Sequence, residues 1–193
     1  MNKLVPGWKS ESGFSLTETM IVVGIAGVLS AMAVIQVTSA RAALRGDAAM
    51  RVLMASMNQA RESAITQRRN MRLVFDANNR IQIIREEVPG PATTVIATRI
   101  FEGGMIYVKN ISTDTPDLFG NSNPVNLPTA AGTPPEVKFT PEGKFVNQNG
   151  ATLNATVSIG RTNELTSSRA ATIMGSTGRV RAFRWDGKKW VLV

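Results

Sequence analysis

The sequence predicts an α+β protein in which a long N-terminal helix packs on a C-terminal antiparallel β-sheet domain. An uncharged, mostly apolar run of 22 residues extends from Thr19 to Ala40. At about 1.5 Å per residue, such a helix can cross a hydrocarbon core about 30 Å thick. Beyond it, apolar residues recur at three- and four-residue steps, and from Met71 the pattern changes to period two. These periods are typical of an amphipathic helix and then of strands.

The helix is predicted to continue well past the apolar run, because no proline occurs between Pro6 and Pro89. Gly46 either weakens this helix by about 1 kcal/mol relative to alanine or marks a bend. The apolar repeat predicts one helix face packed on a sheet. Its members are Leu44, Met50, Leu53, Met54, Met57, Ala60, Ala64 and Ile65.

The second half of the chain predicts ten strands and one long exposed loop, Asn110 to Pro135, rich in Asn, Thr and Pro. A turn is expected at Asn78 and Asn79, residues that tolerate positive φ, and Asp186-Gly187 predicts a hairpin. The predicted strands are Met71–Asp76, Ile81–Arg85, Thr93–Phe101, Met105–Lys109, Glu136–Thr140, Lys144–Asn147, Leu153–Ile159, Ala171–Met174, Arg179–Trp185 and Lys189–Val193.

The composition argues against an enzyme. The 193 residues include no histidine and no cysteine, which excludes Ser-His-Asp and Cys-His catalysis, Cys/His zinc sites and disulfides. Serines, lysines and carboxylates are present, but none forms a recognisable catalytic motif. Asp114 and Asp117 supply too few oxygen ligands for a calcium loop. We therefore expect no catalytic residue, no metal and no cofactor.

The order of segments near the N-terminus is the reverse of a secretory signal, because a short polar stretch, Met1 to Gly13, precedes the apolar run. Lys3 and Lys9 favour a cytoplasmic N-terminus, whereas the arginines that follow the run, from Arg41 onward, oppose it. Charge alone therefore leaves the orientation open.

The residues at this junction are Gly13-Phe-Ser-Leu-Thr-Glu18. They resemble the prepilin cleavage motif of type IV pilins and type II secretion pseudopilins. The resemblance implies that a prepilin peptidase cleaves between Gly13 and Phe14 and that the Phe14 amine is then N-methylated. It also implies that Glu18 helps to recruit the subunit into a filament. A lone carboxylate at the edge of an apolar span supports this role, because pairing with a free amine offsets its cost in lipid.

Two further segments resemble the GspH/FimT branch of minor pilins and pseudopilins. Val137 to Gly143 resembles its F-x-x-x-G motif, and Ile173 to Arg181 resembles its C-terminal motif. The apolar run lacks the midpoint proline common in major pilins, and the chain cannot form the disulfide found in many of them.

The resemblance implies a domain order and a location. Residues 1–13 are expected to be a cleaved leader, 14–40 a transmembrane and filament-core helix, 41–70 an amphipathic helix and 71–193 the β-rich domain. The protein is expected to span the cytoplasmic membrane once, with the globular part outside the cytoplasm. Expected partners are the prepilin peptidase/N-methyltransferase, other pilin or pseudopilin subunits and the inner-membrane assembly platform. A type IV pilus and a type II secretion pseudopilus remain open, as does contact with a secreted substrate.

A DNA-binding function in natural transformation is the alternative. The segment from Arg161 to the C-terminus contains seven basic and two acidic residues. Within it, Gly178-Arg-Val-Arg181 resembles the Gly-Arg-x-Arg signature of the FimT branch, in which that signature is associated with DNA binding. Side chains alternate along a strand, so Arg179 and Arg181 are expected on one face, opposite Arg184. Lys188 and Lys189 extend this candidate site.

Other residues bear on the same alternative. Arg169 is expected to enlarge the positive area, and Trp185 or Trp190 to stack on bases if exposed. A structural interpretation also remains open, in which the arginines pair with Glu164 or Asp186 and the tryptophans belong to the core.

Overall fold

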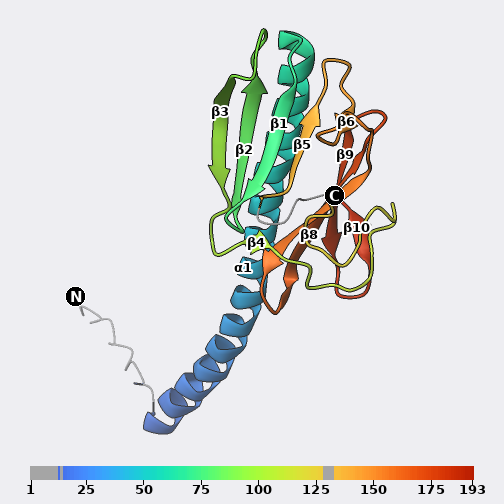
Figure 1. The fold of residues 1–193 in the computed structure, drawn as a ribbon. Helices are drawn as coiled ribbons and strands as arrows, with labels where there is room; N and C mark the ends of the chain where they lie inside the picture. Colours follow the sequence, from blue (N-terminus) through green and yellow to red (C-terminus); the bar gives the residue numbers. More distant parts are fainter. Residues whose placement is uncertain (1–12, 14, 128–132) are drawn as a thin grey trace, which may run out of the picture. The chain divides into compact units, whose positions relative to one another are not determined.

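A computed structural model describes Gly13 and residues 15–127 and 133–193 (Figure 1). The chain divides into two compact units, residues 1–39 and 40–193. Helix α1 (Leu16–Gln67) is continuous over 52 residues. The prediction that the helix extends well beyond the apolar run is therefore confirmed, and Gly46 does not interrupt it.

In the first unit, α1 is apolar and solvent-exposed. The window Leu16–Ala33 has a mean hydropathy of 1.8, and none of it is buried. By length and composition this segment can cross a membrane.

The second unit contains two five-stranded antiparallel sheets. The sequence predicted antiparallel β-structure but not its division into two sheets. The first sheet has the order β3 (Thr93–Ile100), β2 (Arg80–Glu86), β1 (Met71–Asp76), β5 (Glu136–Phe139) and β6 (Phe145–Val146). The second has the order β10 (Trp190–Leu192), β9 (Arg179–Trp185), β8 (Glu164–Met174), β7 (Ala155–Arg161) and β4 (Ile106–Tyr107).

One hydrophobic core joins α1 to both sheets. The helix contributes Ala49, Met50, Leu53, Met57, Ala60 and Ala64, each at most 4% exposed. The predicted face is wrong at Leu44 and Ile65, which are 62% and 42% exposed. Each residue advances about 100° around a helix, so Leu44 lies nearly opposite the neighbouring buried positions Ala42 and Gly46.

Strand β8 begins at Glu164, seven residues before the predicted start at Ala171. The early part of the strand is polar and reads as a loop, yet Ser167, Ser168 and Arg169 are buried. Ser167 Oγ accepts a hydrogen bond from the Arg161 amide (2.9 Å) and donates to the Glu164 carbonyl (2.7 Å). These contacts satisfy polar groups that the sequence pattern assigns to solvent.

Two turn predictions are confirmed, and one loop prediction needs correction. A turn at 77–79 joins β1 to β2 as predicted, with positive φ at Ala77 (50°) and Asn78 (62°). The segment 110–135 lacks regular strands where it is described, but it is not simply exposed, because Ile111, Thr115 and Val125 are at most 9% exposed. Val125 also bridges to Val157. The predicted hairpin at Asp186-Gly187 is confirmed, since Trp185 pairs with Trp190 across it.

Candidate functional site

The first candidate site is the start of α1. The Ser15 hydroxyl accepts a hydrogen bond from the Glu18 amide (3.1 Å), so Ser15 caps the helix and Glu18 lies in its first turn. A negative charge is favourable there because unpaired amides make this end partly positive. Gly13 and Glu18 are exposed. Phe14 lies outside the described residues.

Glu18 has no ionic partner within the described part of the chain. It is followed by exposed apolar side chains, among them Met20 and Val23, which are 67% and 64% exposed. The uncovered apolar helix is unfavourable in water, and the unpaired carboxylate is unfavourable in lipid, so neither environment alone suits both. This end of the chain is therefore suited to an intermolecular contact.

The second candidate site is strand β9. Its pairing with β8 is regular, with Arg181 opposite Thr172 and Arg179 opposite Met174. Arg179 and Arg181 consequently share one face, and Arg184 lies on the other, as the sequence predicted. Arg179 is exposed, whereas Arg181 is half-buried.

Arg181 is paired with a carboxylate that sequence reasoning missed. Its Nη1 lies 2.8 Å from Asp117 Oδ1, and Thr172 Oγ1 donates to Asp117 Oδ2 at 2.5 Å. The Asp117 side chain is only 13% exposed. The sequence offered Glu164 and Asp186 as partners instead, and its single signal for Asp117 was an acid in a loop that was expected to be exposed.

Lys188 and Lys189 lie beyond the opposite end of β9, in the turn to β10. Six residue steps separate Arg179 from Trp185, which places the lysines about 20 Å or more from Arg179. The Asp186 carboxylate accepts hydrogen bonds from the backbone amides of Lys188 (2.8 Å) and Lys189 (2.7 Å). These hydrogen bonds, of which the one from Lys189 has the larger effect, hold the pKa of Asp186 below its usual value. The predicted basic residues thus follow one strand rather than forming one cluster.

The tryptophans are half-buried and pack on each other. The rings of Trp185 and Trp190 are 5.5 Å apart and nearly perpendicular, and Trp190 Nε1 donates to the Thr113 carbonyl at 2.9 Å. Neither ring is free to stack on a base without losing a contact.

Arg169 does not enlarge the positive surface, contrary to the prediction. It is 2% exposed, and its Nε donates to Asp47 Oδ1 at 2.8 Å. Its other nitrogens donate to the carbonyls of Ala43, Thr166 and Ser168, each at 2.9 Å. Arg169 therefore fastens β8 to α1, because a buried guanidinium requires this number of acceptors.

A family comparison decides the classification. Residues 49–178 match the protein family described as "Type II transport protein GspH". The chain belongs to the GspH family. Residues 8–34 match the "Prokaryotic N-terminal methylation motif", which covers Gly13, Phe14 and Glu18. Members of the GspH family are minor pilins and pseudopilins, which are structural subunits and not enzymes. The chain is accordingly a subunit of a type IV pilus or a type II secretion system, with a membrane anchor at its N-terminus.

A solved structure is similar to this GspH-family chain. The crystal structure of the type IV minor pilin FimU from Pseudomonas aeruginosa (strain PAO1) covers 75% of this chain and 91% of its own, with 15% sequence identity and a TM-score of 0.47. No curated protein sequence matches. Among the described residues no group of three or more Asp or Glu side chains could hold a metal ion.

Proposed function

We propose that this GspH-family chain is a minor pilin or pseudopilin that a prepilin peptidase cleaves between Gly13 and Phe14. The new Phe14 amine is then methylated, and the subunit enters a filament through helix α1. The single observation that carries the proposal is Glu18, an exposed carboxylate without an ionic partner among the described residues, in the first turn of an uncovered apolar helix. A Phe14 amine of a neighbouring subunit would supply the missing positive charge.

The proposed topology follows from the same segment. Residues 1–13 form the leader, 14–40 cross the cytoplasmic membrane once, and 41–70 continue the helix into the β-rich domain, 71–193, outside the cytoplasm. The carboxylate explains why such a subunit would leave the bilayer. A charged carboxylate costs roughly 2.5–3.5 kcal/mol at the centre of an inserted helix and less near its end. Pairing in the filament offsets that cost while neighbouring helices cover the apolar surface.

The proposed partners are the prepilin peptidase/N-methyltransferase, other pilin-type subunits and the inner-membrane assembly platform. The exposed apolar side chains of Leu16–Ala33 support helix-to-helix contacts with those subunits. A secreted substrate remains an additional candidate partner for the globular unit if the filament belongs to a type II secretion system.

The test is substitution of Glu18. Because the Ser15 cap uses the backbone amide of Glu18, Glu18→Ala and the isosteric Glu18→Gln retain the start of the helix. We expect both variants to insert and to be cleaved normally but to be lost from sheared filament fractions. Thr19→Ala, at the exposed neighbouring position outside the six-residue motif, is the matched control and should assemble. Normal assembly of both Glu18 variants would contradict the proposal.

A second candidate function, DNA binding, is supported by one feature: Arg179 and Arg181 lie on the same face of β9, and Arg179 is exposed. Forked guanidinium groups suit phosphate oxygens. The Asp117 carboxylate opposes this function, because it already holds Arg181.

Fluorescence anisotropy with duplex DNA at several salt concentrations tests the candidate on the full chain in detergent. If the two arginines contact phosphates, Arg179→Ala/Arg181→Ala weakens binding and lowers the salt slope by about one per arginine. Arg41→Ala/Arg51→Ala removes two exposed charges of α1 well before Arg61, the helix residue beside Gly178, and should change neither. Equal losses in both variants would indicate non-specific attraction, and unchanged affinity in the first would remove this site.

A further inference from the structure

One end of the Ala40–Val193 unit gathers basic side chains from three separate elements. Two contacts define how sheet and helix are aligned. Arg169 Nη2 lies 2.9 Å from the Ala43 carbonyl, whereas a Cβ added at Gly178 would lie 2.9 Å from Arg61 Nε. Strand β8 therefore lies alongside α1 and runs in the same direction. Its Glu164 end lies beside the first residues of the helix in this unit.

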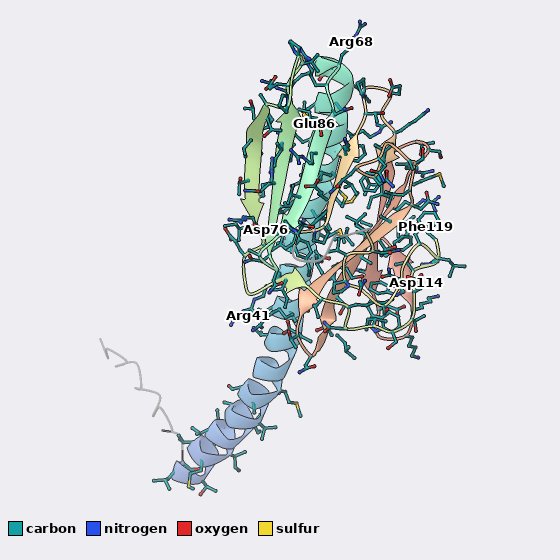
Figure 2. All side chains as sticks on the ribbon, viewed as in Figure 1. Arg41, Arg68, Asp76, Glu86, Asp114 and Phe119 are labelled. Carbon is teal, nitrogen blue, oxygen red and sulfur yellow. The ribbon has the colours of Figure 1, made fainter. Side chains whose placement is uncertain are left out.

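The β9–β10 turn lies at the same end. Arg184 pairs with Arg169 in the sheet, and the chain continues from Arg184 through Lys188 and Lys189. Figure 2 labels Arg41 at this end of the unit and Arg68 at the opposite end. Two hairpin turns of the second sheet, at 162–163 and 186–189, thus lie at the end of the unit where α1 residues Ala40 and Arg41 lie, whereas the third, at 175–178, lies at the opposite end.

At this end, a turn with two glycines, Gly103 and Gly104, lies next to an arginine of α1 and an arginine of β7. A Cβ added at Gly103 would lie 3.3 Å from Arg45 Cγ and Cδ, and one added at Gly104 would lie 3.3 Å from Arg161 Nε. The side chains of Arg45 and Arg161 therefore both lie next to the backbone of this turn. We name this surface the basic rim; it consists of Arg41, Arg45, Arg161, Arg184, Lys188 and Lys189.

The basic rim has a positive balance. Three carboxylates adjoin its six basic residues in the chain or in an ion pair: Glu102 precedes Gly103, Glu164 pairs with Arg161, and Asp186 precedes the two lysines. Asp47 does not count toward it, because it is paired with the buried Arg169. Glu164 lies 3.6 Å from Arg161. Asp186 is occupied by two backbone amides.

Exposed apolar side chains stand among these charges. Leu44, between Arg41 and Arg45, is 62% exposed, and Leu165, next to the 162–163 turn, is 50% exposed. Cationic side chains mixed with exposed leucines are the composition of surfaces that lie at a lipid headgroup layer. Arg41 directly follows the uncharged run that ends at Ala40. A helix that spans the bilayer therefore brings Arg41, the first residue of the basic rim, close to the headgroups by chain connection.

We propose that the basic rim binds the phosphate groups of anionic lipids in the outer leaflet of the membrane that α1 spans. This inference rests on the proposed membrane insertion and adds a second membrane contact to it. The contact holds the globular unit against the bilayer before assembly, and it must be released when the subunit enters the filament. Lys188 and Lys189 contact lipid in this arrangement, whereas Arg179 lies at the far end of β9 and does not.

The absence of cysteine permits a direct test on the full chain in nanodiscs. Thr162→Cys places a fluorescent label at the rim. Ser176→Cys, at an exposed serine in the β8–β9 turn, places the same label at the opposite end of the sheet. When roughly a third of a zwitterionic lipid is replaced by phosphatidylglycerol, we expect acrylamide quenching of the label at residue 162 to fall at least about twofold. The cause is the negative surface potential of the anionic lipid, which salt screens. Residue 176 should not respond.

Further arms identify the ligand. Arg45→Gln/Lys188→Gln/Lys189→Gln should abolish the response at residue 162, and Arg68→Gln/Lys144→Gln, at exposed positions outside the rim, should preserve it. Inorganic phosphate added to purely zwitterionic discs should have no effect; protection by it would indicate a free-phosphate site instead. Protection by duplex DNA without anionic lipid would assign the rim to nucleic acid. Equal quenching in both lipids would overturn the inference.

The same samples separate this inference from the proposed function. Failure of the chain to elute with the discs, or its extraction at alkaline pH, would contradict membrane insertion itself. Stable insertion without a lipid-dependent change at residue 162 would contradict the lipid contact alone.

Discussion

Gly46→Ala should destabilise the globular unit, although helix propensity alone predicts the opposite. In a solvent-exposed helix, alanine is better than glycine by about 1 kcal/mol. At Gly46, however, an added Cβ would lie 2.6 Å from the Ser167 carbonyl oxygen and 3.0 Å from Arg169 Cζ. The first atom belongs to the backbone of β8 and cannot rotate away.

The net effect follows from two opposing terms. Forcing a methyl group into a filled space costs about 1–3 kcal/mol. Moving the Arg169 guanidinium also weakens its bonds to Asp47 (2.8 Å) and Ala43 (2.9 Å), and hydrogen bonds to charged groups contribute about 1.5–3 kcal/mol each. After subtracting the gain in helix propensity, we expect a loss of about 2 kcal/mol. For a domain of this size this lowers Tm by about 4–8 °C.

The assay is thermal and urea unfolding of the full chain in detergent, followed by near-ultraviolet circular dichroism. Ala48→Gly, at an exposed position two residues further along α1, is the control and should cost only the propensity difference of about 1 kcal/mol. If Gly46→Ala raised Tm, close packing of α1 on β8 at this glycine would be refuted.

Three further predictions concern the second sheet. Gly178→Ala should lower the free energy of unfolding by about 3 kcal/mol, because its Cβ would lie 2.2 Å from the Gly143 carbonyl oxygen at a φ of +61°. Gly150→Ala is the control in the same unfolding assay. It should cost about 1 kcal/mol, since Gly150 has a φ of +80° but no neighbour within 4 Å. If DNA binds β9, Asp117→Asn should raise its affinity by up to about fivefold in anisotropy titrations, because a partly exposed ion pair contributes up to about 1 kcal/mol; unchanged affinity would exclude Arg181 from the contact. The lowered pKa of Asp186 contributes stability that is present above its usual value of 3.8 and is lost as pH falls through the folded pKa. The stability difference between wild type and Asp186→Asn should therefore shrink on acidification, and a constant difference down to about pH 2 would contradict this linkage.

Features encoded in short stretches of sequence were predictable. The bounds of β1 and β9 agree with the prediction, and in β1 the alternate residues Met71, Leu73 and Phe75 are buried. The Gly13 to Glu18 motif could be recognised because its six residues are consecutive and stand directly before the apolar run.

Features that depend on distant contacts were not predictable. The pairs Arg181–Asp117 and Arg169–Asp47 join residues 64 and 122 positions apart, and no local pattern reports such a contact. The polar start of β8 was missed by the strand prediction, which began at Ala171, because its serines and Arg169 find partners only after folding. Propensity is a weak guide wherever tertiary hydrogen bonds satisfy buried polar groups.

The two glycine motifs that indicated the GspH/FimT branch meet in space, which changes what they imply. Gly143 ends the F-x-x-x-G segment, and Gly178 begins Gly-Arg-Val-Arg. A Cβ added at Gly178 would be in contact with both Gly143 and Arg61, and one added at Gly143 would lie 3.1 Å from Ile65 Cδ1. The absence of side chains at both turns therefore lets them pack on each other and on α1.

Gly178 is needed for this packing whether or not the chain binds DNA. The Gly178-Arg179 pair is thus evidence for the fold, and only the arginines bear on nucleic acid. Since Arg181 is held by Asp117, the test of DNA binding depends chiefly on Arg179, which is exposed and has no ion pair among the described residues. An Arg179→Ala variant that binds DNA as well as wild type would leave the motif with a structural role alone.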